Sequence, residues 1–137
     1  MGSSDERRSG NVEFPKVLAP LPPTCAFCAI VDGRAPATVM RIWRDAIAFV
    51  PLNPVTEGHV LVIPKYHVID AVQEPQVTAD VMRCAAEYAE RPANIITSAG
   101  GEATQSVFHL HIHVVPRREG DGLTLPWTTA SGRSSDG

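Results

Sequence analysis

Residues 108–115 read FHLHIHVV, with a histidine at every second position and an apolar residue after each histidine. Successive side chains of a β-strand point to opposite faces, so the alternation predicts a strand with three imidazoles on one face. The intervening Leu110, Ile112 and Val114 are then expected to face the core. Shuffling five histidines over 137 residues would give this spacing in about 0.6% of cases. The stretch therefore predicts one strand over residues 107–115 that carries a functional face.

A face of histidines is compatible with two kinds of chemistry. Three imidazoles can hold a zinc ion and leave one position open for water. Alternatively, one neutral imidazole attacks an electrophile while an acceptor on its other ring nitrogen fixes the tautomer. A purely structural role is disfavoured, because neighbouring imidazoles repel each other when protonated and pack no better than threonine or valine. The residues alone leave both kinds of chemistry open.

The rest of the chain predicts four more strands and one long helix. The strands are expected over residues 38–44, 46–50, 59–63 and 95–97. The long helix is expected over residues 78–91, with Thr78 as N-cap and Pro92 beyond its end. A short helix follows Thr24, its expected N-cap, and ends at Asp32-Gly33. Because the long helix separates groups of strands, we predict the α+β class, with a five-stranded antiparallel sheet, one long helix and one or two short ones.

The composition indicates one small domain. A chain of 137 residues with 44% hydrophobic residues can close one core. Its polar ends predict mobile tails at residues 1–11 and 128–137 around a single domain over residues 12–127. No long apolar run or export signal is present, so we expect a cytoplasmic protein without a membrane partner. The net charge of −3 argues against a nucleic-acid partner.

Three blocks of the chain together resemble the histidine-triad (HIT) family. Residues 105–117 (QSVFHLHIHVVPR) are similar to the family signature, and residues 58–67 (GHVLVIPKYH) resemble its second block. The family's opening block is resembled by Cys25-Ala26-Phe27-Cys28 together with Ala35-Pro36-Ala37 of this chain. The resemblance covers residues 24–127. It implies the HIT fold and a nucleotide hydrolase or transferase that acts at the α-phosphorus of nucleoside phosphoramidates or (di)nucleotide conjugates. A covalent nucleotidyl-histidine intermediate and release of a nucleoside monophosphate are implied as well.

The resemblance also implies roles for the catalytic residues. His111, the middle histidine, is similar in position to the nucleophile. Ser106 would donate a hydrogen bond to the leaving-group atom, and His113 would contact the phosphate or steady the His111 ring. His59 would complete the hydrogen bonding around the site. The expected catalytic residues are thus His59, Ser106, His109, His111 and His113.

Binding of the nucleotide is implied at two places. Gln105 and the amides near it would hold phosphate oxygens. An apolar slot for a purine base, with the sugar beside it, would be built from Phe27, Ile30, Phe49, Val50, Leu52 and Asn53. One departure concerns Pro51, which stands where relatives usually carry an aspartate or asparagine that accepts the ribose hydroxyls.

The pair Cys25 and Cys28 has the C-x-x-C spacing of metal sites and redox pairs. A redox pair is disfavoured because no thioredoxin-like βαβ pattern surrounds it, and a reduced pair of small core residues stays open. The family resemblance implies a structural zinc site in which His67 and His109 join the two cysteines. Two thiolates and two imidazoles would close a tetrahedral site and leave no position for water. No organic cofactor is expected.

Two other functions stay open at this point. One is a metal-dependent hydrolase in which His109, His111 and His113 bind a catalytic ion, although the only acidic residues near the triad are Glu102 and Glu119. The other is a nucleotide-binding module without turnover. The expected partner is a small-molecule nucleotide. The resemblance further implies a homodimer, in which a C-terminal tryptophan such as Trp127 reaches the partner's site.

Overall fold

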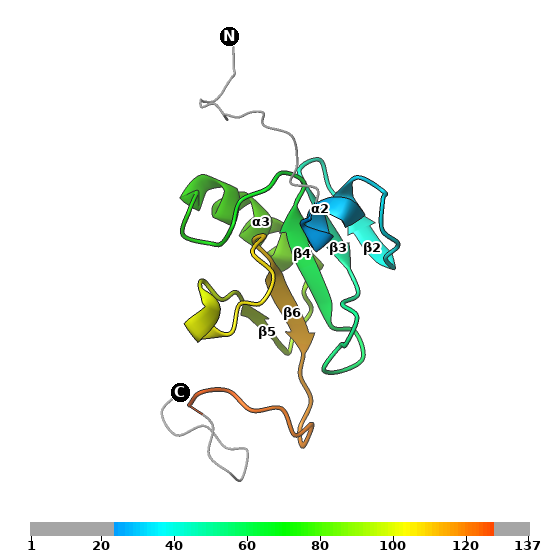
Figure 1. The fold of residues 1–137 in the computed structure, drawn as a ribbon. Helices are drawn as coiled ribbons and strands as arrows, with labels where there is room; N and C mark the ends of the chain where they lie inside the picture. Colours follow the sequence, from blue (N-terminus) through cyan, green and yellow to red (C-terminus); the bar gives the residue numbers. More distant parts are fainter. Residues whose placement is uncertain (1–23, 128–137) are drawn as a thin grey trace.

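The computed structural model describes residues 24–127, which form a five-stranded antiparallel sheet with helices on both faces (Figure 1). The strand order is β2-β3-β4-β6-β5, and each neighbouring pair is antiparallel. The strands are β2 (Val39–Ile42), β3 (Ala46–Phe49), β4 (Val60–Pro64), β5 (Ala93–Ile96) and β6 (Ile112–Pro116). The predicted α+β class and sheet are confirmed. The predicted tails, and residues 12–23 of the predicted domain, lie outside the described residues.

Within residues 24–127, two α-helices lie on opposite faces of the sheet (Figure 1). The long helix α3 (Pro75–Tyr88) packs on β4 and β6, and the short helix α2 (Ala26–Val31) covers the other face. Both faces of β3 and β4 are therefore buried, which explains why these strands read as continuous apolar runs. Each fully buried side chain of this kind, such as Ile63, contributes about 1.5–3 kcal/mol to stability. The buried strands β3 and β4 thus form a rigid support for the histidine segment beside them.

The helix starts differ from the predictions. Cys25, and not Thr24, is the N-cap of α2, and its Sγ accepts a hydrogen bond from the Cys28 amide at 3.3 Å. The long helix begins at Pro75, because the fixed φ of proline suits a first helical position. Thr78 is therefore not the N-cap, and its hydroxyl donates to the Ala71 carbonyl at 2.7 Å.

The prediction of a strand over residues 107–115 was wrong at its start. β6 begins only at Ile112, because its pairing with β4 ends at Val62 and Ile112, and its pairing with β5 ends at Ile96 and His113. The preceding segment keeps the predicted alternation, and Leu110, Ile112 and Val114 are buried as expected. His109 and His111 thus lie on a segment beyond the end of the sheet ladder. The ends of the other strands differ from prediction by one or two residues.

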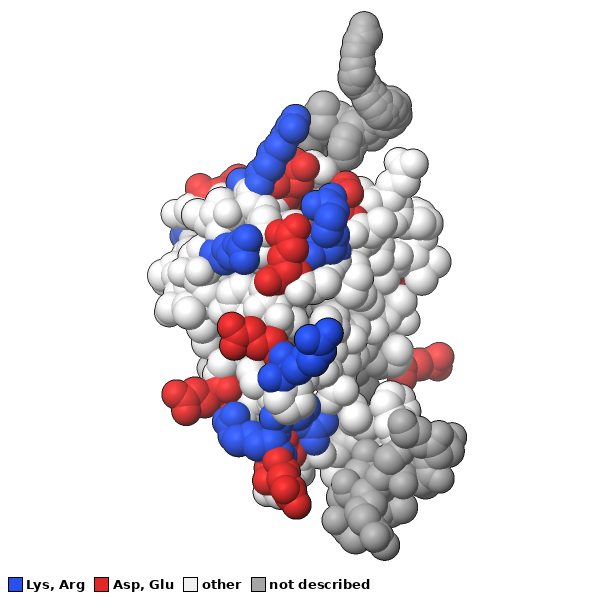
Figure 2. Space-filling view, turned by 180° about the vertical axis from the view of Figure 1, so that it is seen from behind, with Lys and Arg blue, Asp and Glu red and all other residues white. Residues whose placement is uncertain are grey.

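The surface carries charges of both signs and a groove. Viewed from the side opposite to Figure 1, acidic and basic side chains are intermixed across the surface (Figure 2). A groove of about 320 Å³ lies between α3 and the turn before β3, with Trp43, Tyr66 and Cys84 in its wall, and it contains no triad histidine. None of the helices in residues 24–127 is long and apolar enough to span a bilayer.

Candidate functional site

His111 is half-buried between two aromatic neighbours. The edge of one ring meets the face of the other in both contacts, with centroid distances of 5.2 Å to Phe27 and 5.2 Å to His113. The Nδ1 atom of His111 lies 2.8 Å from the His109 carbonyl oxygen. A carbonyl only accepts, so Nδ1 carries the proton and donates it. In the neutral ring Nε2 is then left with a free lone pair, which is the atom needed for nucleophilic attack.

A chain of hydrogen bonds fixes the tautomers of His59 and His113. The Val55 amide donates to Nδ1 of His59 at 3.0 Å, so a neutral His59 carries its proton on Nε2. That nitrogen lies 3.0 Å from Nδ1 of His113 and donates to it. His113 therefore carries its own proton on Nε2, the ring nitrogen that His59 does not use. The pair presents a hydrogen-bond donor beside His111 without any positive charge.

Burial keeps these two imidazoles neutral. Burial lowers the pKa of His113 to about 4, and the nearby His111 and His59 rings act in the same direction. The pKa of His59 is also lowered by burial. Both rings are thus neutral at pH 7, as the hydrogen-bond chain requires.

The low pKa of His113 predicts an acid-sensitive stability. An unfolded histidine has a pKa near 6.5, so between about pH 6.5 and 4 the unfolded chain binds more protons than the folded one. Stability is then lost as the pH falls through this window. We expect the melting temperature of the wild type to fall more between pH 7 and 5 than that of His113→Gln, which does not titrate there. Equal decreases in the two proteins would contradict this assignment.

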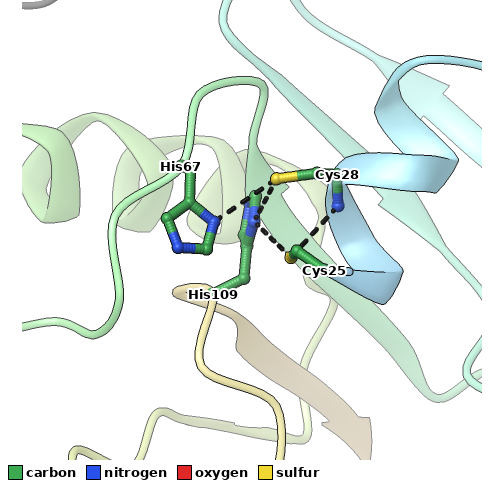
Figure 3. Close-up of side chains that lie close together, drawn as sticks. All are labelled: Cys25, Cys28, His67 and His109. Carbon is green, nitrogen blue, oxygen red and sulfur yellow. Dashed lines mark hydrogen bonds between the residues drawn. The ribbon is translucent and has the colours of Figure 1, made fainter. Parts of the chain in front are cut away.

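Four side chains from three segments meet on the α2 face of the sheet (Figure 3). Cys25 and Cys28 come from the first turn of α2, His67 follows β4, and His109 precedes β6. Their ligand atoms all lie within 4.8 Å of one another. The Cys28 Sγ atom is 3.3 Å from Nδ1 of His67 and 3.5 Å from Nδ1 of His109, and Cys25 Sγ is 3.4 Å from the latter.

These distances fit a tetrahedral metal site. With metal–sulfur bonds of about 2.3 Å and metal–nitrogen bonds of about 2.0–2.1 Å, neighbouring ligand atoms are about 3.3–3.8 Å apart. Nε2 of His109 lies 3.1 Å from the Pro64 carbonyl and donates to it, which leaves Nδ1 free for a metal. Burial lowers the pKa of His109 to about 4, so its ring is neutral, as a ligand must be. The four residues can therefore hold a zinc-like cation.

The same burial opposes free thiolates at this cluster. Burial, with smaller contributions from the hydrogen bond to Cys25 and the charge of Cys25, raises the pKa of Cys28 to about 12. A bound divalent cation would offset this cost, because it stabilises the thiolate form directly. The donor set is thus better suited to a cation than to an exposed reactive thiol pair.

Gln105 is buried, and its side chain is used by the protein itself. Its Oε1 accepts from the Gly100 amide at 2.7 Å, and its Nε2 donates to the carbonyls of Ile69 at 2.7 Å and Val107 at 3.1 Å. These bonds hold the loop that leads into Ser106, which is exposed. The Gln105 side chain thus links the loop to the segments of Ile69 and Val107.

The residues predicted for the base and ribose do not all come together. Phe27 and Phe49 are buried and meet edge to face at 5.4 Å, and Ile30 packs against them. Leu52 is 98% exposed and Asn53 is also exposed, while Val50 is half-buried. Phe27 thus lies beside His111 with Phe49 packed against it, while Leu52 and Asn53 are exposed.

Thr97 is a functional candidate that the sequence did not reveal. Its hydroxyl donates to the His111 carbonyl at 2.7 Å. Threonine is an ordinary residue at the end of a strand, and only the pairing of β5 with β6 brings it to the histidine.

Comparisons with known proteins agree with this geometry. The HIT domain family model matches residues 33–120. The chain is 38% identical over 112 residues to an uncharacterized HIT-like protein of Mycobacterium tuberculosis, Rv1262c, covering 74% of this chain and 76% of the relative. It is 33% identical over 120 residues to adenosine 5'-monophosphoramidase HNT1 of Saccharomyces cerevisiae, covering 82% of this chain and 76% of the relative.

Solved structures show the same similarity. A HIT family protein from Bacillus anthracis superposes with a TM-score of 0.69 at 30% identity, covering 80% of this chain and 84% of that protein. A zinc-bound histidine triad family protein from Mycobacterium smegmatis has a TM-score of 0.65 at 37% identity, covering 82% of this chain and 84% of that protein.

Proposed function

Because the chain belongs to the HIT family, we propose that it hydrolyses nucleoside phosphoramidates or related nucleotide conjugates by attack of His111 on the α-phosphorus. The observation that carries the proposal is the hydrogen bond from His111 Nδ1 to the His109 carbonyl. This bond leaves Nε2 as the lone-pair nitrogen. One relative is named as an adenosine 5'-monophosphoramidase, which supports a P–N bond to a nucleotide as the bond that is cleaved.

The proposed reaction has two steps. In the first, the Nε2 lone pair forms a bond to phosphorus while the bond to the leaving group breaks, and the leaving group, hydrogen-bonded to the Ser106 hydroxyl, takes up a proton from the solvent. In the second, water attacks the phosphorus and releases one proton to the solvent, the P–N bond to His111 breaks, and a nucleoside monophosphate departs. Splitting the reaction in this way replaces one difficult displacement by two easier ones.

His113 is proposed to stabilise the charge that develops on the phosphate oxygens. The hydrogen-bond chain from Val55 through His59 leaves the His113 proton on Nε2. A fixed donor of this kind contributes roughly 10²–10³-fold in rate when it faces the transition state. The amides of the loop before Ser106, which Gln105 holds, would supply further donors. Phe27 and Phe49 are proposed to support the base.

We further propose that Cys25, Cys28, His67 and His109 hold a structural zinc ion, as the ligand distances support. When bound, the ion joins α2 to the segment that carries His111 and takes no substrate, because four protein ligands complete its coordination. Reduced cysteines of this kind favour a cytoplasmic location. A homodimer is proposed because, in the described sheet, β2 and β5 each have one unpaired side that a second copy would cover.

The alternative of a catalytic metal on three histidines is not favoured by the geometry. Nδ1 of His109 faces the cysteines, and Nδ1 of His113 faces His59, so the three rings do not converge on one point. Among residues 24–127, the group of close metal ligands includes only His109 of the triad.

The test is release of AMP from adenosine 5'-phosphoramidate, with a diadenosine polyphosphate and adenosine 5'-phosphosulfate as competing conjugates. We expect turnover of at least one conjugate, with an initial rate that brief treatment with EDTA does not change. Turnover that stops at once with EDTA in the folded protein would favour a catalytic metal. Binding of AMP by calorimetry without turnover of any conjugate would favour a binding module instead.

A further inference from the structure

His111 lies just beyond the end of the sheet. The ladder between β5 and β6 ends at the pair Ile96 and His113, and the ladder between β4 and β6 ends at the pair Val62 and Ile112. The His111 peptide therefore lacks the ladder bonds that fix the residues after it. A nucleophile nevertheless has to be held within about 0.5 Å of its productive position. Another contact has to supply this precision.

The hydroxyl of Thr97 provides a bond where the ladder stops. Thr97 follows the last residue of β5, is half-buried, and donates to the His111 carbonyl at 2.7 Å. Threonine is branched at Cβ, which restricts its χ1 angle and keeps the hydroxyl aimed at this carbonyl. The bond therefore fixes the His111 main chain from the side of β5.

His111 is thus held at two points. Its ring donates from Nδ1 to the His109 carbonyl, and its own carbonyl accepts from Thr97. The ring bond sets which nitrogen is free, whereas the carbonyl bond sets the rotation of the peptide and hence the direction of Nε2. The two contacts have different effects and can be separated by mutation.

We propose that Thr97 is a positioning residue that fixes the line of attack of His111. This inference rests on the proposed function. Loss of the hydroxyl leaves the carbonyl without this partner and allows the peptide to rotate. A displacement of about 1 Å can cost roughly 100-fold in rate, because the reacting atoms lose their alignment. The effect is expected in kcat and not in KM, since the Thr97 hydroxyl acts on the His111 carbonyl.

The test compares Thr97→Val, which keeps the shape and removes the hydroxyl, with Thr97→Ser, which keeps the hydroxyl. Thr78→Val is the matched control, because the Thr78 hydroxyl donates to a backbone carbonyl at the same distance of 2.7 Å on α3. For Thr97→Val we expect kcat to fall by about 10–100-fold with KM within about twofold. Thr97→Ser should stay within about threefold of wild type. Thr78→Val should lower the melting temperature and keep kcat.

A second readout does not depend on turnover. The ¹⁵N–¹H spectrum of the His111 ring should show the Nδ1–H tautomer in all three proteins, because the ring bond to the His109 carbonyl is unchanged. In Thr97→Val the ring signals should be broadened, because the rotation of the His111 peptide is no longer fixed. A Thr97→Val protein with unchanged kcat and an unchanged ring spectrum would overturn the proposal, even if its melting temperature fell. If the wild type turns over no conjugate, the proposed function fails, and the ring spectrum still decides the role of Thr97.

Discussion

The substitution His111→Ala is expected to lower kcat for AMP release by roughly 10⁴-fold or more, because it removes the attacking nitrogen itself. The fold should survive, since His111 is only half-buried and makes no bond within the sheet ladder. The measurement is steady-state AMP release together with the melting temperature of each protein. We expect the melting temperature to stay within a few degrees of wild type.

The variant His113→Gln is the control whose kcat is compared with that of His111→Ala. It removes an imidazole next to His111 and leaves the nucleophile in place, so its expected loss is the roughly 10²–10³-fold of a single transition-state donor. A His111→Ala protein that keeps more than about a tenth of the wild-type rate would exclude this residue as the nucleophile.

Of the proposed substitutions, Cys28→Ser is expected to cause the largest loss of stability. Cys28 is fully buried and its sulfur is close to both His67 and His109. When the free zinc concentration is about a thousand times the Kd, binding stabilises the folded state by about 4 kcal/mol. Loss of the ion should therefore lower the melting temperature by on the order of 10–20 °C. The zinc content, measured by mass spectrometry of the metal, should fall from about one ion per chain to near zero.

The variant Cys84→Ala is the control for Cys28→Ser. Cys84 is also buried, but it packs in the core on the α3 face and is not among the four clustered ligands. Cys84→Ala should lower stability by the cost of a small cavity and keep its zinc. Equal zinc contents in the two variants would contradict the proposed metal site.

The histidine segment shows what a local pattern can predict. The alternation identified the core-facing residues correctly, because side-chain direction depends on the local backbone, and Leu110, Ile112 and Val114 are all buried. The start of the strand was wrong because a strand exists only where a partner pairs with it. The last pairs with Val62 of β4 and Ile96 of β5 determine that limit, and both partners lie elsewhere in the sequence.

The metal cluster and Thr97 show where sequence reasoning stops. The spacing of Cys25 and Cys28 indicates one helical turn, but the joining of His67 and His109 came only from the family resemblance. Thr97 had no signal at all, because its role depends on the register of two strands. The exposed position of Leu52 likewise depends on the path of a loop, which apolar composition does not reveal. The predicted phosphate contact of Gln105 stays a prediction, and its side chain holds the loop.

The most direct test of covalent catalysis is a rapid-quench experiment with adenosine 5'-phosphoramidate, followed by mass spectrometry of the intact protein and of its peptides. During a single turnover, the wild type should gain the mass of one adenylyl group on the peptide that contains His111. That mass should disappear as AMP forms, and His111→Ala should never show it. AMP formed in the first turnover without an adduct on the wild type, or with an adduct on another residue, would contradict attack by His111.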